Sequence, residues 1–470
     1  MAPVIARLVS ESKPYLIPGK LLVKELWFEV PLDHTKPDSK TIKLFARSAI
    51  KYERPIVEPS PTEDTQRPYI VFLQGGPGFG NPNPQDSPLS KYMIERGYEL
   101  LLLDYRGTGF SCPVSADTLE LVGGPQEQAD YLKLFRADTI VKDSEAVRLC
   151  LTKDFPPEKK KWSIFGQSFG GMTCLTYLSF APEGLREAFI TGGLAALDKG
   201  PFEVYQATFR RCIDRNKAYY QKYPDDVAAV KWVAGKIQEL GGAKGVPLPA
   251  GGFLTVPNLL TLGLNFGMDG GLDRVHGFVL KMKADLDQFG LLTRATLNSF
   301  EQELGFDTAP IYALLHEPCW MHGPGFASNW AADRVGRSLE EYQWLRDDGS
   351  WSLGSLAPAQ PLYFLGEMVP RFHFDARQEL ARLKATADLL AAFDQWPHLY
   401  DVAQLARNDV PVYAAAYNDM YVDPDLARET ARRVRGIKVF ETNVLYHGAV
   451  RSKPDEVFKA LLSLRDDTID

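Results

Sequence analysis

Apolar residues follow two kinds of pattern in the first third of the chain, and each kind indicates a different type of strand. Between residues 20 and 50, apolar and polar positions alternate on both sides of the turn-rich segment 33–39, which predicts an antiparallel β-hairpin. The runs 69–73 and 98–103 are short and almost wholly apolar, and each leads into a glycine-rich loop. Short buried strands of this kind are typical of a parallel sheet that is covered by helices.

The same strand pattern continues around a second glycine-rich segment. A short apolar run at 161–165 precedes Gly166-Gln-Ser-Phe-Gly-Gly171, and an apolar helix is expected to start behind it, at 172–178. Another strand is expected at 185–193, and helical spacing at 137–149 predicts a helix before the strand at 161–165. Alternation of strands and helices predicts an α/β fold.

The pattern changes between about residues 197 and 405. Amphipathic helical spacing replaces the strands there, for example at 202–240 and 377–393. Glycine- and proline-rich breaks separate these helical segments, and strand–helix alternation is missing from the whole region. We therefore expect residues 197–405 to form a helical cap domain inserted into the α/β domain.

Strand patterns return at the end of the chain. Apolar runs at 409–416 and 437–441 predict two further strands, and residues 454–465 have the spacing of a terminal helix. The catalytic α/β domain is thus expected to consist of residues 1–196 and 406–470, with the cap between its two parts.

The segment from Gly166 to Gly171 has the spacing of a nucleophile elbow, a tight turn in which a serine follows a strand and starts a helix. Such a turn holds Ser168 in a strained backbone conformation and exposes its hydroxyl above the sheet. The alternative is a glycine-rich turn with a serine of no chemical role. Partners for Ser168 elsewhere in the chain would decide between the two.

A serine nucleophile needs a base, and the base needs an acid that orients it. Asp419 comes in the loop after one late strand, and His447 comes in the loop after the next. The order Ser168, Asp419, His447 is that of α/β-hydrolases. Asp423 is an alternative acid, but Asp419 is preferred because it lies closer to the end of its strand. Each of the two aspartates could instead cap a helix or a turn, and His447 could be a loop histidine.

The negative charge that develops on the substrate needs backbone N–H donors. One donor is expected to be the N–H of Phe169, directly after the nucleophile. The other is expected in the loop Gly75-Gly-Pro-Gly78, and Gly76 is preferred over Gly75. The loop could also cradle a phosphate, but it lacks the lysine of a P-loop and the spacing G-x-G-x-x-G.

Composition limits the partners of the protein. The chain has 470 residues, of which 45% are hydrophobic and 24% are charged, as in ordinary globular proteins. Its formal net charge of −7 argues against nucleic acid and against an anionic membrane surface. No apolar run is long enough for a transmembrane helix. The pattern favours no particular oligomeric state.

Cysteine usage points to a reducing compartment. Cys112, Cys150, Cys174, Cys212 and Cys319 are odd in number, widely spaced and without a C-x-x-C pair, which predicts reduced thiols in a cytoplasmic protein. The first residues do not have the pattern of a signal peptide. Histidine and cysteine do not cluster at zinc-ligand spacing, so no metal site is expected. A serine nucleophile with its base and acid also needs no organic cofactor.

Three motifs together resemble a known family. These are Gly75-Gly-Pro-Gly78, Asp104-Tyr-Arg-Gly-Thr-Gly-Phe-Ser111 and Gly166-Gln-Ser-Phe-Gly-Gly171. In this order they resemble the prolyl aminopeptidases (proline iminopeptidases), serine peptidases of the α/β-hydrolase fold, and the resemblance covers most of the chain. Many members carry histidine at the position of Gln74, and the glutamine points to the longer branch of the family. The resemblance implies release of an N-terminal residue, preferably proline, from peptides.

The resemblance also implies carboxylates in the cap that bind the free N-terminus of a peptide. Glu317 and Glu367 occur in the two segments that are similar to the family's, and their neighbours are apolar. Either could instead be a solvated glutamate at a helix end. The aromatic residues Tyr312, Trp320 and Trp330 could wall a proline ring or belong to the core of the cap.

The expected substrates are therefore short peptides with a free N-terminus, cleaved by a Ser-His-Asp triad through an acyl-enzyme. Two alternatives remain open. The same triad would serve a small-molecule esterase or lactonase, and a catalytically silent hydrolase fold could act as a binding module.

Overall fold

The computed structural model describes residues 3–38, 40–53, 66–303, 305–345, 357 and 359–467. Within these ranges, ten strands form one sheet in the order β1-β3-β4-β6-β5-β7-β8-β11-β12, and β2 pairs with β3. The strands are β1 (Arg7–Glu11), β2 (Tyr15–Ile17), β3 (Leu21–Pro31), β4 (Thr41–Lys51), β5 (Tyr69–Leu73), β6 (Glu99–Leu103), β7 (Trp162–Gln167), β8 (Leu185–Thr191), β11 (Val412–Ala416) and β12 (Ile437–Glu441). The predicted α/β-hydrolase fold is confirmed.

The sheet has an antiparallel part and a parallel part. The predicted hairpin is confirmed as β3 and β4, which pair in register from Leu21 opposite Lys51 to Pro31 opposite Thr41. From β6 through β5, β7, β8 and β11 to β12 the strands are parallel. All residues of β5 and β7 are buried, as expected for central strands that helices cover on both faces.

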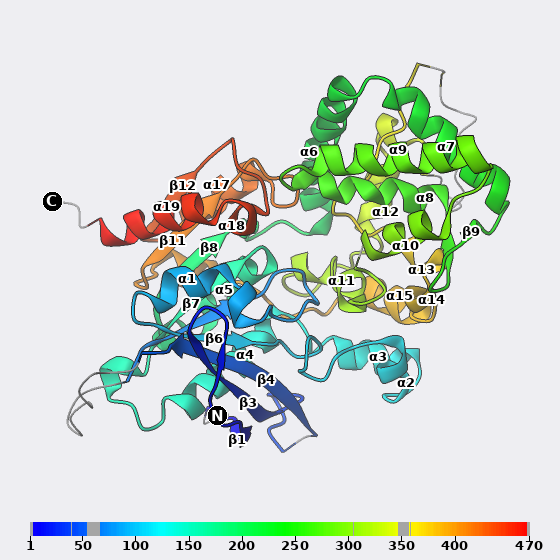
Figure 1. The fold of residues 1–470 in the computed structure, drawn as a ribbon. Helices are drawn as coiled ribbons and strands as arrows, with labels where there is room; N and C mark the ends of the chain where they lie inside the picture. The colour runs from blue at the N-terminus through cyan, green and yellow to red at the C-terminus, as the bar shows by residue number, and fades with distance from the viewer. Residues whose placement is uncertain are drawn as a thin grey trace.

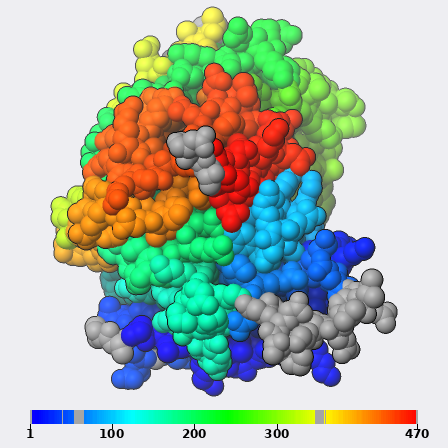
Figure 2. All heavy atoms as spheres, turned by 90° about the vertical axis from the view of Figure 1, so that its left-hand side faces the viewer, coloured from blue at the N-terminus to red at the C-terminus, as the bar shows by residue number. Residues whose placement is uncertain are grey.

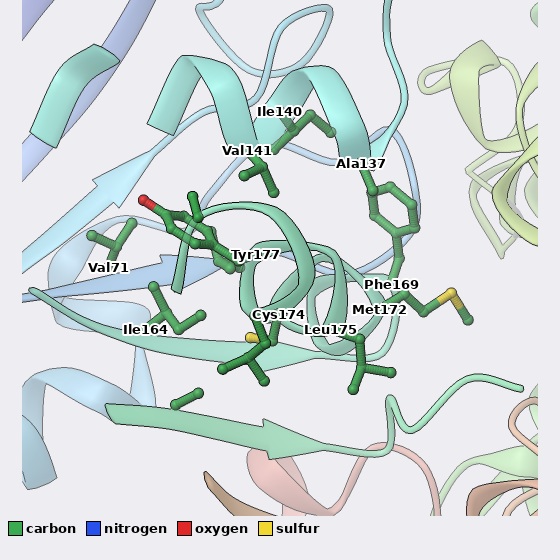
Figure 3. Close-up of a cluster of buried hydrophobic side chains, with 14 of the residues drawn as sticks. Val71, Ala137, Ile140, Val141, Ile164, Phe169, Met172, Cys174, Leu175 and Tyr177 are labelled. Carbon is green, nitrogen blue, oxygen red and sulfur yellow. The ribbon is translucent and has the colours of Figure 1, made fainter. Parts of the chain in front are cut away.

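Helices cover both faces of the sheet. They are α1 (Pro88–Ile94), α4 (Ala137–Leu151), α5 (Phe169–Phe180), α16 (Val402–Ala406), α17 (Pro424–Arg433), α18 (Ala449–Ser452) and α19 (Pro454–Asp466). Two further helices, α2 (Ala116–Glu120) and α3 (Pro125–Leu132), lie away from the sheet and pack against the helical region between β8 and β11 (Figure 1). On one face, α5 packs between Ile164 of β7 and Ile140 of α4 (Figure 3). On the other face, Tyr92 of α1 stacks on Phe458 of α19 with ring centroids 4.2 Å apart, and the two segments adjoin in Figure 2.

Between β8 and β11 the chain is mostly helical, as predicted, and Figure 1 shows these helices gathered beside the sheet. The elements are α6 (Pro201–Lys222), α7 (Asp226–Gly241), β9 (Val246–Pro247), β10 (Phe253–Leu254), α8 (Val256–Leu260), α9 (Gly271–Phe289), α10 (Arg294–Glu303), α11 (Pro310–Leu314), α12 (Ala331–Arg337), α13 (His373–Ala376), α14 (Gln378–Ala381) and α15 (Lys384–Ala392). Short 3₁₀ helices lie at Pro84–Asp86, Pro157–Lys159, Pro182–Gly184, Thr261–Gly267, Pro318–Trp320 and Glu340–Tyr342.

Much of this region shares one hydrophobic core, which includes Phe209, Val233, Leu260 and Phe364 and extends to Met420 and Tyr421 of the α/β part. The bounds of the cap at residues 197 and 405 remain a prediction. In the described part of the chain, no helix is both long and apolar enough to cross a membrane.

Two segments that the pattern presents as continuous helices are broken. The segment 202–240 contains α6 and α7, and the segment 377–393 contains α14 and α15. The first break falls at Tyr223, which leaves the helical conformation with φ −127° and ψ 73°. Pro224 follows it, and proline disfavours helical backbone in the residue before it. The apolar spacing continues across both breaks, so periodicity alone does not reveal them.

Candidate active site

Ser168 lies at the turn between β7 and α5, with φ 57° and ψ −123°. This conformation is strained for a residue other than glycine, as the elbow pattern predicts. The turn also brings two backbones very close together, because a Cβ on Gly170 would lie 1.8 Å from the carbonyl oxygen of Leu73. Only glycine fits at that position, so the pattern around Ser168 has a direct structural cause.

His447 and Asp419 form a buried pair, and His447 lines the same cavity as Ser168. Nδ1 of His447 lies 2.5 Å from Oδ2 of Asp419. The other carboxylate oxygen, Oδ1, accepts the backbone N–H groups of Tyr421 at 2.8 Å and Val422 at 3.2 Å. A carboxylate can only accept, so the proton of the imidazole is on Nδ1 and Nε2 is left with a lone pair. The structure therefore brings together the predicted acid and base.

The environment of His447 holds its pKa above the usual value. Desolvation alone lowers this pKa, but the charge and hydrogen bond of Asp419, together with the charge of Glu367, outweigh it. The ring of Tyr421 packs edge-on against the imidazole at 4.6 Å between centroids. Asp423, the alternative acid, caps α17 instead, accepting the N–H groups of Asp425 and Leu426. It has no contact of this kind with His447.

The loop after β5 is held by Gln74. Its Oε1 accepts the N–H of Gly75 at 2.9 Å, and its Nε2 donates to the carbonyl of Gly80 at 3.1 Å. The N–H of Gly76 has no acceptor among the described residues, and Gly76 has a φ of 122°, which favours glycine. Phe169 is the first residue of α5, so its N–H has no acceptor within the helix. Gly76 and Phe169 are thus available as donors, whereas the N–H of Gly75 is already engaged.

A cavity of about 440 Å³ opens above the elbow, between the sheet and the cap. It is lined by Gln74, Gly75, Gly76, Phe79, Gln167, Ser168, Leu264, Met268, Glu303, Gly305, Tyr312, Glu367, Tyr421, His447, Gly448, Val450 and Arg451. Of the predicted site residues, Ser168, His447, Gly76, Glu367 and Tyr312 therefore share one cavity. Its size suits a small ligand such as one or two amino-acid residues.

Glu367 enters this cavity from the cap, and 15% of its side chain is exposed. Its Oε1 accepts the hydroxyl of Tyr312 at 2.5 Å, and its Oε2 lies 3.9 Å from Nε2 of His316. His316 is oriented by Tyr205, whose hydroxyl lies 2.8 Å from Nδ1. Burial alone raises the pKa of Glu367, but His316, His447 and Tyr312 outweigh burial and lower it. The cavity that Ser168 lines therefore also contains a carboxyl group whose pKa is held low.

Glu317 is buried in the cap but does not line this cavity. Its Oε1 accepts the N–H of Ala332 at 2.9 Å, and its Oε2 accepts no hydrogen bond in the described part of the chain. Burial raises the pKa of Glu317 to about 7. Tyr205 experiences the charges of both Glu317 and Glu367, so the two carboxyl groups share one neighbourhood. A direct contact between Glu317 and a substrate remains a prediction.

The three predicted aromatic residues lie in different places. Tyr312 lines the cavity and packs against Phe79 with centroids 5.3 Å apart. Trp320 is buried in the hydrophobic core that also contains Ile164 of β7 and Ile140 of α4. Trp330 donates from Nε1 to Asp388 at 3.1 Å. Neither tryptophan lines the cavity, so their contact with a substrate stays a prediction.

Sequence reasoning missed three residues around the cavity. Tyr421 follows Asp419 by two positions, and Arg451 follows His447 by one turn of helix, so both could have been found from the triad itself. His316, the neighbour of Glu317 in the chain, turns toward Glu367 instead. Only the packing of the cap reveals that contact.

The five cysteines all lie in the described part and are free thiols. The residues that the structure describes contain no group of three or more His, Cys, Asp or Glu side chains suited to a metal ion.

Residues 68–230 match the family model of the α/β-hydrolase fold. The chain is also 41% identical over 454 residues to a proline iminopeptidase of Aspergillus aculeatus, covering 96% of each chain. It is 37% identical over 445 residues to the proline iminopeptidase of Aeromonas sobria, covering 94% of this chain and 96% of that one. The chain belongs to the proline iminopeptidase family.

Membership of the proline iminopeptidase family extends to the cap, because both relatives match nearly the whole chain and not only its α/β part. A solved structure of proline iminopeptidase from Mycobacterium smegmatis is a more distant match. It is 14% identical with a TM-score of 0.37, and the match covers 93% of this chain and 99% of that one.

Proposed function

We propose that this protein is a serine aminopeptidase that releases N-terminal proline from short peptides. Similarity along nearly the whole chain to two proline iminopeptidases supports this substrate class. The observation that carries the proposal is one cavity that holds both the nucleophile Ser168 and the carboxylate Glu367. An esterase needs the first group, whereas an aminopeptidase needs both.

In the proposed mechanism, Ser168 Oγ attacks the carbonyl carbon of the first residue while Nε2 of His447 takes the hydroxyl proton. Asp419 holds the imidazole in the tautomer that can accept that proton. The N–H groups of Gly76 and Phe169 donate to the oxyanion.

When the C–N bond breaks, His447 gives the proton to the departing amine and leaves a prolyl ester on Ser168. Water then attacks the ester carbonyl as His447 takes one of its protons. The C–O bond to Ser168 breaks, the proton returns to Oγ, and free proline leaves the cavity.

The ammonium group of the substrate is proposed to bind the carboxylates of the cap. The lowered pKa of Glu367 keeps this group ionised at neutral pH, so it can pair with the cation directly. Glu317 lies close behind, and a cation in the cavity would favour its ionised form as well. Tyr312 is proposed to pack against the proline ring.

A cytoplasmic location remains part of the proposal, because the free cysteines suit a reducing compartment. Peptides with a free N-terminus are the proposed partners.

The experiment that tests the proposal is a panel of aminoacyl-p-nitroanilides offered to the wild-type protein. We expect prolyl-p-nitroanilide to be hydrolysed faster than the alanyl compound, and N-acetylprolyl-p-nitroanilide to be rejected. Cleavage of p-nitrophenyl esters without cleavage of any free aminoacyl anilide would instead make the protein an esterase.

A further inference from the structure

Arg451 is a cation of the cavity that the proposed mechanism does not use. It lies on α18 and lines the same cavity as Ser168 and His447. Its guanidinium donates to Oε1 of Gln74 at 3.1 Å, and the side chain is otherwise exposed. Among the described residues, no carboxylate forms an ion pair with it.

The two other charged side chains that line the cavity already have partners. Glu367 accepts from Tyr312 and lies near His316. Glu303 is paired with Arg274, whose Nη2 donates to it at 2.8 Å. Neither carboxylate neutralises Arg451. The cavity therefore combines a carboxylate for a substrate's ammonium with a guanidinium that has no anionic partner.

His447 lines the same cavity as the carboxylate of Glu367 and the guanidinium of Arg451. Glu367 raises its pKa, whereas Arg451 lowers it. His447 is also the group that protonates the departing amine, so the leaving group must lie beside it. In a dipeptide, the carboxylate of the leaving residue is only one carbon away from that amine. The carboxylate of the leaving residue would thus lie near His447, where the guanidinium of Arg451 can bind it.

We propose that Arg451 binds the free carboxylate of the leaving amino acid, so that dipeptides of the form prolyl-Xaa are the preferred substrates. This inference rests on the proposed function and adds the leaving-group side to it. Arginine has five N–H donors in a planar fork, and the bond to Gln74 leaves enough of them for a carboxylate.

The competing role of Arg451 is structural. Gln74 Oε1 accepts from both Arg451 and Gly75, so the guanidinium helps to hold the loop that carries Gly76. That role predicts the same loss for all substrates when Arg451 is replaced. Binding of a carboxylate predicts a loss only for substrates with a free carboxylate.

The test compares prolyl-alanine with prolyl-alanine amide on the wild type, Arg451→Gln, Arg451→Lys and Lys453→Gln. Lys453 is an exposed cation at the end of the same helix and is the matched control. We expect the ratio of kcat/KM for acid over amide to fall about tenfold in Arg451→Gln, chiefly through KM. The fall should be smaller in Arg451→Lys and absent in Lys453→Gln. Comparing ratios between variants cancels the intrinsic difference between the two leaving groups.

An equal loss for acid and amide in Arg451→Gln would overturn the inference in favour of the structural role, while the proposed function would stand. If the wild type cleaves no prolyl substrate, the proposed function and the inference about Arg451 are both wrong. Should Arg451→Gln fail to fold, Arg451→Lys and a salt series on the wild type decide. Added KCl should lower the acid-to-amide ratio, and a ratio that salt does not change would contradict binding by charge.

Discussion

The two sides of the cavity are built differently. On the sheet side, Ser168, Asp419 and His447 each follow the end of a strand, and backbone groups fix them. On the cap side, Glu367 and Glu317 are of the same residue type and share one neighbourhood, yet the pKa of Glu367 is lowered and that of Glu317 is raised to about 7. Local turns therefore place the groups of the sheet side, whereas burial and neighbours decide the charge of the groups on the cap side.

Replacement of the nucleophile tests the sheet side most severely. Ser168→Ala is expected to lower kcat for prolyl-p-nitroanilide by about 10⁶-fold, since no other group can form the acyl-enzyme. Ser179→Ala, on the same helix, is the control, because its hydroxyl only bonds to the carbonyl of Leu175. Retention of activity in Ser168→Ala would remove the triad from the mechanism.

Asp419→Asn should lower kcat by about 10⁴-fold, because an amide no longer favours the tautomer with the proton on Nδ1. The pH profile should change as well. In the wild type, the raised pKa of His447 means that kcat/KM is lost as the pH falls through a value above 6.5. Without the charge of Asp419, desolvation dominates, so this limb should move to lower pH.

Asp423→Asn is the matched control for that experiment. Asp423 caps α17 and pairs with Arg211 at 2.7 Å, so its loss should lower stability and leave the acid limb in place. A larger effect on kcat for Asp423 than for Asp419 would reverse the assignment of the acid.

Glu367→Gln probes the cap side. We expect kcat/KM for prolyl-p-nitroanilide to fall about 100-fold, as a charge-assisted hydrogen bond to the ammonium becomes a weaker neutral one. Glu303→Gln changes another carboxylate of the cavity, one that Arg274 already pairs, and should cost only a few-fold. Indifference of the enzyme to Glu367→Gln would favour the esterase alternative, and ester hydrolysis should be measured alongside.

Glu317→Gln should have the smallest effect on kcat/KM, at most about tenfold, and a distinct effect on stability. Because burial raises the pKa of Glu317 from 4.5 to about 7, the folded state favours the protonated acid. The contribution of protonated Glu317 to the stability of the fold is present below pH 4.5 and is lost as the pH rises through about 7.

The neutral amide avoids that loss. The free energy of unfolding of Glu317→Gln at pH 8.5 should therefore exceed that of the wild type by about 3 kcal/mol, with little difference at pH 4.5. Equal stability of the two proteins at both values would show that Glu317 is solvated. The distinction between the two cap glutamates would then disappear.

Eight strands of the sheet were predictable because each depends on its own short segment, whereas β1 and β2, which are short and mostly exposed, were missed. The hairpin β3–β4 and the strand β12 lie where the apolar pattern predicts them. The ends of the helices within the long helical segments were harder to predict, since the break at Tyr223 and Pro224 does not disturb the apolar spacing. The elbow was predictable from Gly170, because any larger residue there would clash with the carbonyl oxygen of Leu73.

The sequence by itself determined the α/β fold and the order of Ser168, Asp419 and His447, because turn geometry and glycine requirements act between near neighbours. Tertiary structure alone decided which groups of the cap reach the cavity. Glu367 lines it and Glu317 lies behind it, although both have apolar neighbours in the chain. The charge of a buried carboxyl group depends on neighbouring atoms that come from distant segments of the chain, and a local sequence pattern does not show which atoms those are.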